Sequence, residues 1–216
     1  MNASSNKSRI LRLKVWGENA CFTRPEMKVE RVSYDVMTPS AARGILEAIL
    51  WKPAIRWHVA QIDVLNPIRW TSVRRNEVGS VMSPRSKGFF IEDQRQQRAG
   101  LFLRDVAYTI HAWFEMTEKA GSEDTVFKFQ EMFLRRAGKG QSFQRPYFGC
   151  REFAAHFEPV FPDQPFPEPI QENRELGYML HDMDYSESPP QPRFFRAEIA
   201  NGELKIPPCD NAEVRS

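Results

Sequence analysis

The segment Val106–Met116, VAYTIHAWFEM, decides the fold of this chain because its side chains alternate between two chemically different faces. Every second residue, starting at Val106 and ending at Met116, is apolar or small. A period of two is typical of a β-strand that buries one of its faces. We therefore expect a long strand with one face in the core. Its other face carries Thr109, His111, Trp113 and Glu115.

The segments around this strand predict an alternating order of strands and helices. Leu11–Trp16 alternates like a half-buried strand, and Thr38 followed by Pro39 is typical of a helix start. Ile55–Leu65 is rich in β-formers, but its alternation changes phase, as a bulge would require. We expect strands at 11–16, 55–65, 106–116 and 151–159, and helices at 38–51 and 122–138.

This order of elements predicts an α+β fold with a ferredoxin-like core of the RNA-recognition-motif type, in which two helices back an antiparallel sheet. We expect residues 1–160 to form this domain, with a basic insertion at 66–104 between its second and third strands. Residues 161–216 begin Pro-rich and end in a hairpin signal around Asn201-Gly202. They are expected to form a small C-terminal β extension.

The charge of the chain is unevenly distributed, although its formal net value is only +2. Basic residues dominate the stretch 69–104, and acids dominate the stretch 160–190. A basic stretch is suited to a polyanion, although a solvated loop can show the same pattern. The basic residues are Arg69, Arg74, Arg75, Arg85, Lys87, Arg95, Arg98 and Arg104.

Several classes of protein are disfavoured by what the sequence lacks. It has no Walker loop, GxSxG elbow, HExxH helix or dinucleotide fingerprint. The cysteines Cys21, Cys150 and Cys209 are widely spaced, which predicts neither a disulfide framework nor a zinc site, and we expect no metal or cofactor. Without a signal or membrane segment, the chain is expected to be a cytoplasmic protein.

Five stretches carry a family resemblance. They are FTRPEMKVERVSYDVMTPSAARGILEAILWKP (22–53), NPIRW (66–70), RRNEV (74–78), RQQRA (95–99) and GQSFQRPYFGCREF (140–153). In order, over roughly residues 9–160, they resemble the CRISPR-associated Cas family five of subtype I-C (Dvulg), within the RAMP superfamily. The resemblance implies a ferredoxin-like core, metal-independent cleavage of the precursor-crRNA repeat hairpin, and residence with other Cas subunits in a crRNA-guided surveillance complex.

Metal-independent RNA cleavage needs a base, an acid and cations around the phosphate, and histidine titrates in the required range. Among His58, His111, His156 and His181, we expect His111 to act as base or acid, because its strand face is polar and also carries an aromatic residue. A histidine satisfied structurally within a sheet is the alternative. Lys52 is expected to neutralise the phosphate, or else to be a surface lysine near a helix end.

The expected RNA-binding side chains are arginines and one tryptophan. Guanidinium groups suit phosphates and the wide groove of a hairpin stem, and a tryptophan can position a flanking base. Glycines at 138, 140 and 149 lie in the region that the resemblance matches to the family's glycine-containing loop, or else they end a helix. The expected contacts are Arg74, Arg75, Arg95, Arg98, Trp113, Arg145 and Arg151.

The sequence departs from the family at two positions. Relatives carry an aromatic or histidine in place of Leu50, and a histidine in place of Trp113. His111 lies one strand step from Trp113 and is expected to substitute for the displaced imidazole. Two alternatives to an enzyme that cuts at the 3′ base of the stem stay open. One is a non-catalytic RNA-binding subunit, and the other is a general binder of duplex nucleic acid, DNA included.

Overall fold

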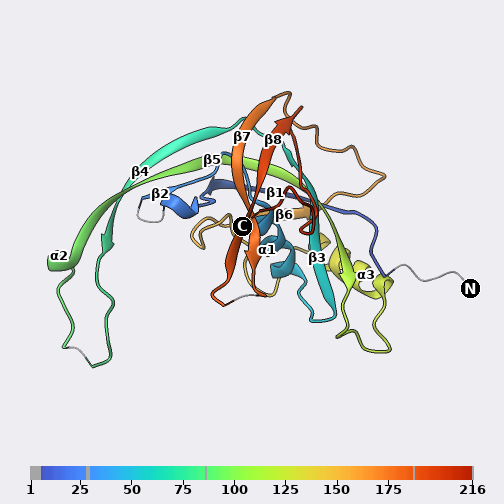
Figure 1. Cartoon of the computed structure of the whole chain (residues 1–216), viewed down its shortest axis with the longest axis horizontal. Helices are drawn as coiled ribbons and strands as arrows, with labels where there is room; N and C mark the ends of the chain where they lie inside the picture. The colour runs from blue at the N-terminus through green and yellow to red at the C-terminus, as the bar shows by residue number, and fades with distance from the viewer. Residues whose placement is uncertain (1–5, 28–29, 86, 187, 216) are drawn as a thin grey trace, which may run out of the picture.

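The computed structural model describes residues 6–27, 30–85, 87–186 and 188–215, which form a nine-stranded, mostly antiparallel sheet with the longer helices packed on one face (Figure 1). The elements are β1 (Leu11–Ala20), η1 (Pro25–Met27), β2 (Arg31–Val32), α1 (Pro39–Ile49), β3 (Ile55–Val64), β4 (Arg69–Val78), α2 (Ile91–Gln94), β5 (Arg95–Met116), α3 (Val126–Gly138), β6 (His156–Pro159), β7 (Arg174–Asp184), β8 (Gln191–Ala200) and β9 (Glu203–Lys205). The fold is therefore α+β.

The core lies between the sheet and the helices α1 and α3. In β5 the inward residues Ile110 and Phe114 are fully buried, as the alternation of this segment predicts. Phe133 of α3 packs in the same cluster. Helix α1 begins as expected, with the Thr38 hydroxyl accepting a hydrogen bond from the Ala41 amide at 3.3 Å.

The order β6-β1-β5-β3 places the long strand β5 at the centre of the sheet, antiparallel to both neighbours. The expected phase change in β3 is confirmed as a register shift between Val59 and Gln61. The expected strand 151–159 is wrong in its start, because Arg151 and Glu152 form a turn and only His156–Pro159 pairs with β1.

Strand β5 also begins much earlier than predicted, at Arg95 instead of Val106. Asp105 has a φ of +53°, which interrupts the alternation. Before it, Leu103 is buried in the core cluster, whereas its neighbour Phe102 is buried against Phe153 and Arg75. The first half of β5 pairs with β4 from Val78↔Arg95 to Arg69↔Arg104. We call residues 66–104 the arm, because this ribbon projects from the body of the molecule (Figure 1).

The C-terminal residues extend the same sheet. The predicted turn Asn201-Gly202 is confirmed, with φ values of +52° and +79°, and it joins β8 to β9. Strand β9 pairs with β3, so β7, β8 and β9 continue the sheet beyond its central strands. The sequence did not predict β7, whose pairing with β8 shifts register at two places.

One segment crosses the sheet face opposite α1 and α3, which we call the outer face. The amide of Val160 donates to the Arg12 carbonyl of β1 at 3.0 Å, and the amide of Ile170 donates to the Val64 carbonyl of β3 at 2.8 Å. Between these anchors, the Phe166 ring lies 4.5 Å from the Arg12 guanidinium. We call residues 160–170 the strap, because they pass over β5 and partly cover its outer face.

Candidate functional site

The outer face of β3 and β5 gathers the polar side chains that the sequence singled out. His111 and Trp113 lie on it as predicted, together with Glu115. Strand β3 adds His58 and Asp63, which the antiparallel register brings opposite the β5 residues. Two imidazoles therefore share this face, although the sequence pointed only to the one on β5.

His111 is held by both of its ring nitrogens. Its Nδ1 accepts a hydrogen bond from Nε of Arg12 at 3.2 Å, so the ring proton sits on Nε2, which donates to Oδ2 of Asp63 at 2.6 Å. The strap residue Phe166 covers Arg12, and the His111 side chain is only 16% exposed. In this conformation neither nitrogen is open to a substrate.

His58 has a different environment. Its ring stacks on Trp113, with 4.2 Å between ring centroids and an interplanar angle of 14°. Its Nε2 lies 3.1 Å from Oε1 of Glu115, and the side chain is 25% exposed. Burial lowers the pKa of His58, and the hydrogen bond to Glu115 opposes this effect. The ring is therefore neutral at neutral pH and can accept a proton.

Lys52 lines a groove that it shares with His58 and not with His111. It follows α1 and is exposed, and the groove, of about 880 Å³, is also lined by Arg56 and Glu115. His111, under the strap, does not contribute to the lining of this groove as the structure describes it. His111 and Lys52 were predicted to carry the chemistry. Of these two, only Lys52 lines this groove, and the imidazole that it shares the groove with is that of His58.

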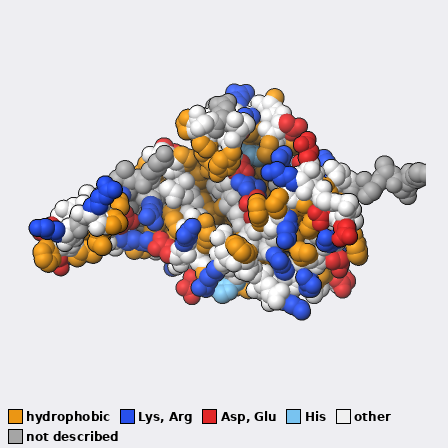
Figure 2. All heavy atoms as spheres, turned by 90° about the horizontal axis from the view of Figure 1, so that it is seen from below, with side chains coloured by type: hydrophobic (Ala, Val, Ile, Leu, Met, Phe, Trp, Pro, Cys, Tyr) orange, Lys and Arg blue, Asp and Glu red, His pale blue; other side chains and the backbone are white. Residues whose placement is uncertain are grey.

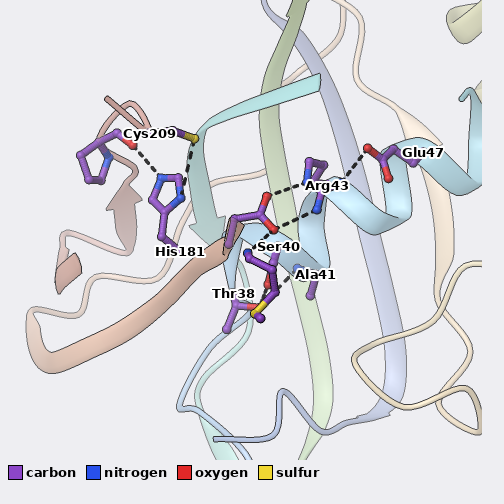
Figure 3. A network of polar contacts seen from close by, with 10 residues as sticks. Thr38, Ser40, Ala41, Arg43, Glu47, His181 and Cys209 are labelled. Atoms are coloured by element: carbon purple, nitrogen blue, oxygen red, sulfur yellow. Dashed lines mark hydrogen bonds and ion pairs between the residues drawn. The ribbon is translucent and has the colours of Figure 1, made fainter. Parts of the chain in front are cut away.

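One wall of this groove is fixed by a network that ties α1 to β7 (Figure 3). Arg43 donates from Nε and Nη2 to the two carboxylate oxygens of Asp182, at 2.7 and 2.9 Å, and from Nη1 to Glu47 at 2.7 Å. Behind it, His181 donates from Nε2 to the Pro207 carbonyl at 2.8 Å, and Cys209 Sγ lies 3.9 Å from its Nδ1. The Arg43 charge is therefore already neutralised within the protein.

Leu50 is fully buried in the core, and its carbonyl accepts a hydrogen bond from Trp57 Nε1 at 2.9 Å. Position 50, where the sequence was expected to depart from its family, therefore faces the core. Trp51, the next residue, is 60% exposed and lines both the His58 groove and a second groove of about 610 Å³. Phe143, 89% exposed, also lines the second groove. Neither aromatic was predicted as part of the site, because the exposure of their rings has no signature in the local sequence pattern.

The glycines of the loop after α3 have structural explanations. Gly140, with a φ of +63°, follows the end of the helix, where a left-handed residue is usual. Gly149, with a φ of +77°, packs so closely on the Cys21 carbonyl that a Cβ would clash. The predicted contacts Arg145 and Arg151 are both exposed in this region.

The structure separates the predicted arginines of the arm into two pairs. Arg75 donates to Glu152 at 2.6 Å and stacks on Phe102, and Arg98 lies 3.5 Å from Glu77. Arg74 and Arg95 are exposed, and no ion pair of theirs is found among the described residues. Figure 2 shows basic side chains along the arm and apolar ones at its tip. The exposed apolar residues there are Val81, Met82, Phe89, Phe90 and Ile91.

The described part of the chain offers neither a metal cluster nor a membrane-spanning helix. No group of three or more His, Cys, Asp or Glu side chains placed to hold a metal ion is found there. None of the helices described is both long and apolar enough to cross a membrane.

Comparison with known proteins gives consistent matches. Residues 10–207 match the family described as CRISPR-associated protein (Cas_Cas5). A protein of Mannheimia succiniciproducens, named CRISPR pre-crRNA endoribonuclease Cas5d, is 52% identical over 95% of this chain and 98% of its own length. A protein of the same name from Thermus thermophilus is 46% identical over 91% of each chain.

Solved structures share the fold. A crystal structure of a CRISPR-associated protein matches with a TM-score of 0.73 and 23% identity, over 97% of this chain and 98% of the other. A chain of a CRISPR RNA-guided surveillance complex matches with a TM-score of 0.53 and 12% identity, over 92% and 91% of the two chains. At these identities the structural matches support the fold and not the chemistry.

Proposed function

This chain belongs to the CRISPR-associated Cas5 family in its type I-C form, and from that membership we propose that it is an endoribonuclease that cuts precursor crRNA. The observation that carries the proposal is the 52% identity, over 95% of the chain, to a protein named as such an enzyme. Its proposed substrate is the repeat hairpin, cut at the 3′ base of the stem.

The fold we propose for the core is ferredoxin-like. It would comprise β1, α1, β3, β5, α3 and β6, with the arm as an insertion between its second and third strands. The strand order β6-β1-β5-β3 with all neighbours antiparallel supports this assignment. Residues 161–216 would be the C-terminal extension, although they share the sheet with the core through β9.

The proposed RNA-binding surface is the arm together with the loop after α3. Arg74 and Arg95 are exposed on the arm, and Arg145 and Arg151 are exposed near the loop. Guanidinium groups without internal acidic partners are suited to phosphates. Arg75 and Arg98 are paired with Glu152 and Glu77, so each would have to leave its acidic partner to bind a phosphate. Trp113 is stacked on His58, so a base that contacts it would lie next to His58.

The proposed reaction needs no metal. The 2′-hydroxyl attacks the adjacent phosphorus, the bond to the 5′-oxygen breaks, and a cyclic phosphate remains on the upstream product. We propose Lys52 as the cation, and the sequence predicts His111 as base or acid. For His111 to act, Phe166 and Arg12 would first have to move, because they cover it and occupy its Nδ1.

Incubation of the purified protein with a labelled repeat RNA in EDTA tests the proposal. Specific cleavage is the expected result. Specific binding without cleavage would instead indicate a non-catalytic subunit, and binding of any duplex, DNA included, with steep salt dependence would indicate a general binder. We further propose that other Cas subunits of a surveillance complex are partners, and that the protein acts in the cytoplasm. The exposed apolar tip of the arm is compatible with such a partner.

A further inference from the structure

The four histidines of the chain differ in what their ring nitrogens already contact. Both nitrogens of His111 are occupied, by Arg12 and Asp63. His181 is 5% exposed, donates to the Pro207 carbonyl and has Cys209 beside its other nitrogen. His156 stacks on Trp16 at the sheet edge, away from the groove that holds Lys52. Only His58 lines that groove.

The contacts of His58 define which nitrogen can act. A neutral imidazole that donates from Nε2 to the Glu115 carboxylate leaves the lone pair of Nδ1 available as an acceptor. Stacking on Trp113 fixes the plane of the ring. Arg56, with its Nη1 4.0 Å from Oε1 of Glu115, helps to hold that carboxylate in place. The ring is thus oriented before any substrate arrives.

The charges of the groove leave two cations for a phosphate, Lys52 and Lys119, which have no ion pair among the described residues. Arg43 is paired with Asp182 and Glu47, and Arg56 lies beside Glu115. Lys52 is exposed, and within the described residues it has no acid within ion-pair distance. A phosphodiester drawn to the Lys52 ammonium would lie in the groove that His58 lines.

We propose that His58 is the general base of the cleavage reaction, with Lys52 neutralising the phosphate, Glu115 positioning the ring, and His111 left in a structural role. This assignment rests on the proposed endoribonuclease function. His58 Nδ1 takes the proton of the 2′-hydroxyl as its oxygen bonds to phosphorus. The phosphorus bond to the 5′-oxygen breaks, that oxygen takes a proton from water, and His58 later returns its proton to the solvent.

The test uses the full-length protein, EDTA and the labelled repeat of its own CRISPR array, with binding and single-turnover cleavage measured separately. His58→Gln keeps a side chain that can donate to Glu115 but cannot take up the proton. We expect it to bind RNA like wild type and to cut about a hundred- to ten-thousandfold more slowly. His58→Ala should lose cleavage similarly and regain part of it when imidazole is added.

His156→Ala is the matched control and should cut at the wild-type rate, since His156 lies outside the groove. If wild type and His58→Gln cut equally fast, the assignment of His58 is overturned while the endoribonuclease function stands. Rescue of His111→Ala by imidazole, with none for His58→Ala, also overturns it. If wild type itself does not cut, the proposed function fails, and the role of His58 fails with it.

Discussion

His58 and Trp113 occupy directly opposed positions of β3 and β5, and their rings stack with 4.2 Å between centroids. Cross-strand aromatic pairs of this kind stabilise a sheet and restrict the rotamers of both partners. The side chain of Trp113 therefore contacts the imidazole of His58.

Removing the Trp113 ring should loosen His58. Trp113→Ala is expected to lower the free energy of unfolding by about 1–3 kcal/mol, because it removes the stacking and part of the packed area. It should also slow cleavage, since the imidazole loses its fixed plane. Trp113→Phe, which retains a flat ring, is the control and should preserve most of both properties. Urea unfolding and single-turnover cleavage measure the two effects, and equal cleavage by wild type and Trp113→Ala would contradict the positioning role.

The arm should bind RNA mainly through its unpaired arginines. The double variant Arg74→Ala, Arg95→Ala is expected to bind RNA more weakly and with a smaller dependence on salt. The slope of log affinity against log salt concentration should become shallower by about 0.7–0.9 for each phosphate that the protein no longer neutralises. The affinity measured at several salt concentrations tests this. An unchanged slope would remove these two arginines from the interface.

Arg75 should behave differently, because Glu152 and the Phe102 ring already hold it. Arg75→Ala is expected to lower the stability of the protein more than Arg74→Ala does, because it removes the packing on Phe102 and leaves Glu152 only its longer contact to Arg31, at 3.7 Å. Thermal unfolding of the two single variants makes the comparison. Equal melting temperatures would show that the Arg75 contacts contribute nothing measurable.

The pair of His111 and Asp63 should be structural. Asp63 is buried, and its carboxylate accepts from His111 at 2.6 Å. Asp63→Ala leaves the imidazole without its acceptor and is expected to cost about 1–3 kcal/mol of unfolding free energy. Cleavage measured below the unfolding transition should persist in His111→Ala. A stable His111→Ala variant that cannot cut would instead support the base predicted from the sequence.

The strap offers an independent test of whether His58 or His111 is the catalytic base. Phe166→Ala removes the ring over Arg12 and so uncovers the route to His111. If His58 is the base, we expect the cleavage rate to stay within about twofold of wild type, which is well below the factor contributed by a general base. A clear acceleration would mean that strap opening limits the reaction, and that the catalytic group lies beneath it.

The stability of the protein should depend on pH through His58. Burial lowers its pKa below the ordinary value of 6.5, Glu115 opposes the shift, and the nearby cations Arg56 and Lys7 add to it. Between the folded-state pKa and 6.5 the unfolded chain binds more protons, so the free energy of unfolding falls as the pH drops through this window. His58→Gln should reduce this fall. Urea unfolding of both proteins across the window tests the sign, and an identical pH dependence would contradict it.

The central part of the fold could be predicted from local patterns. The alternation of Val106–Met116 indicated the face that packs in the core, although Ala107 and Thr109 of the other face are buried too, and Asn201-Gly202 indicated its turn. Both signals lie within a few residues. The start of β5 could not be predicted in the same way. The left-handed residue Asp105 interrupts the alternation, and the preceding half of the strand is stabilised by pairing with β4.

The site was harder to predict because it depends on contacts between distant residues. His111 was chosen from the polarity of its own strand face, but Arg12 and Asp63, which occupy its nitrogens, come from other strands. His58 stands in a segment whose alternation changes phase, so its face was ambiguous until the register with Trp113 was known. The strap over His111 depends equally on anchors far apart in sequence.

Cleavage of a repeat RNA with a single 2′-deoxy sugar just before the cut tests the proposed mechanism most directly. In EDTA, the wild-type protein is expected to cut the all-RNA hairpin and leave a cyclic phosphate. It should leave the deoxy substrate intact, because that substrate lacks the nucleophile, while binding both equally well. Cleavage of the deoxy substrate, or cleavage that appears only when a divalent metal is added, would contradict the proposed mechanism.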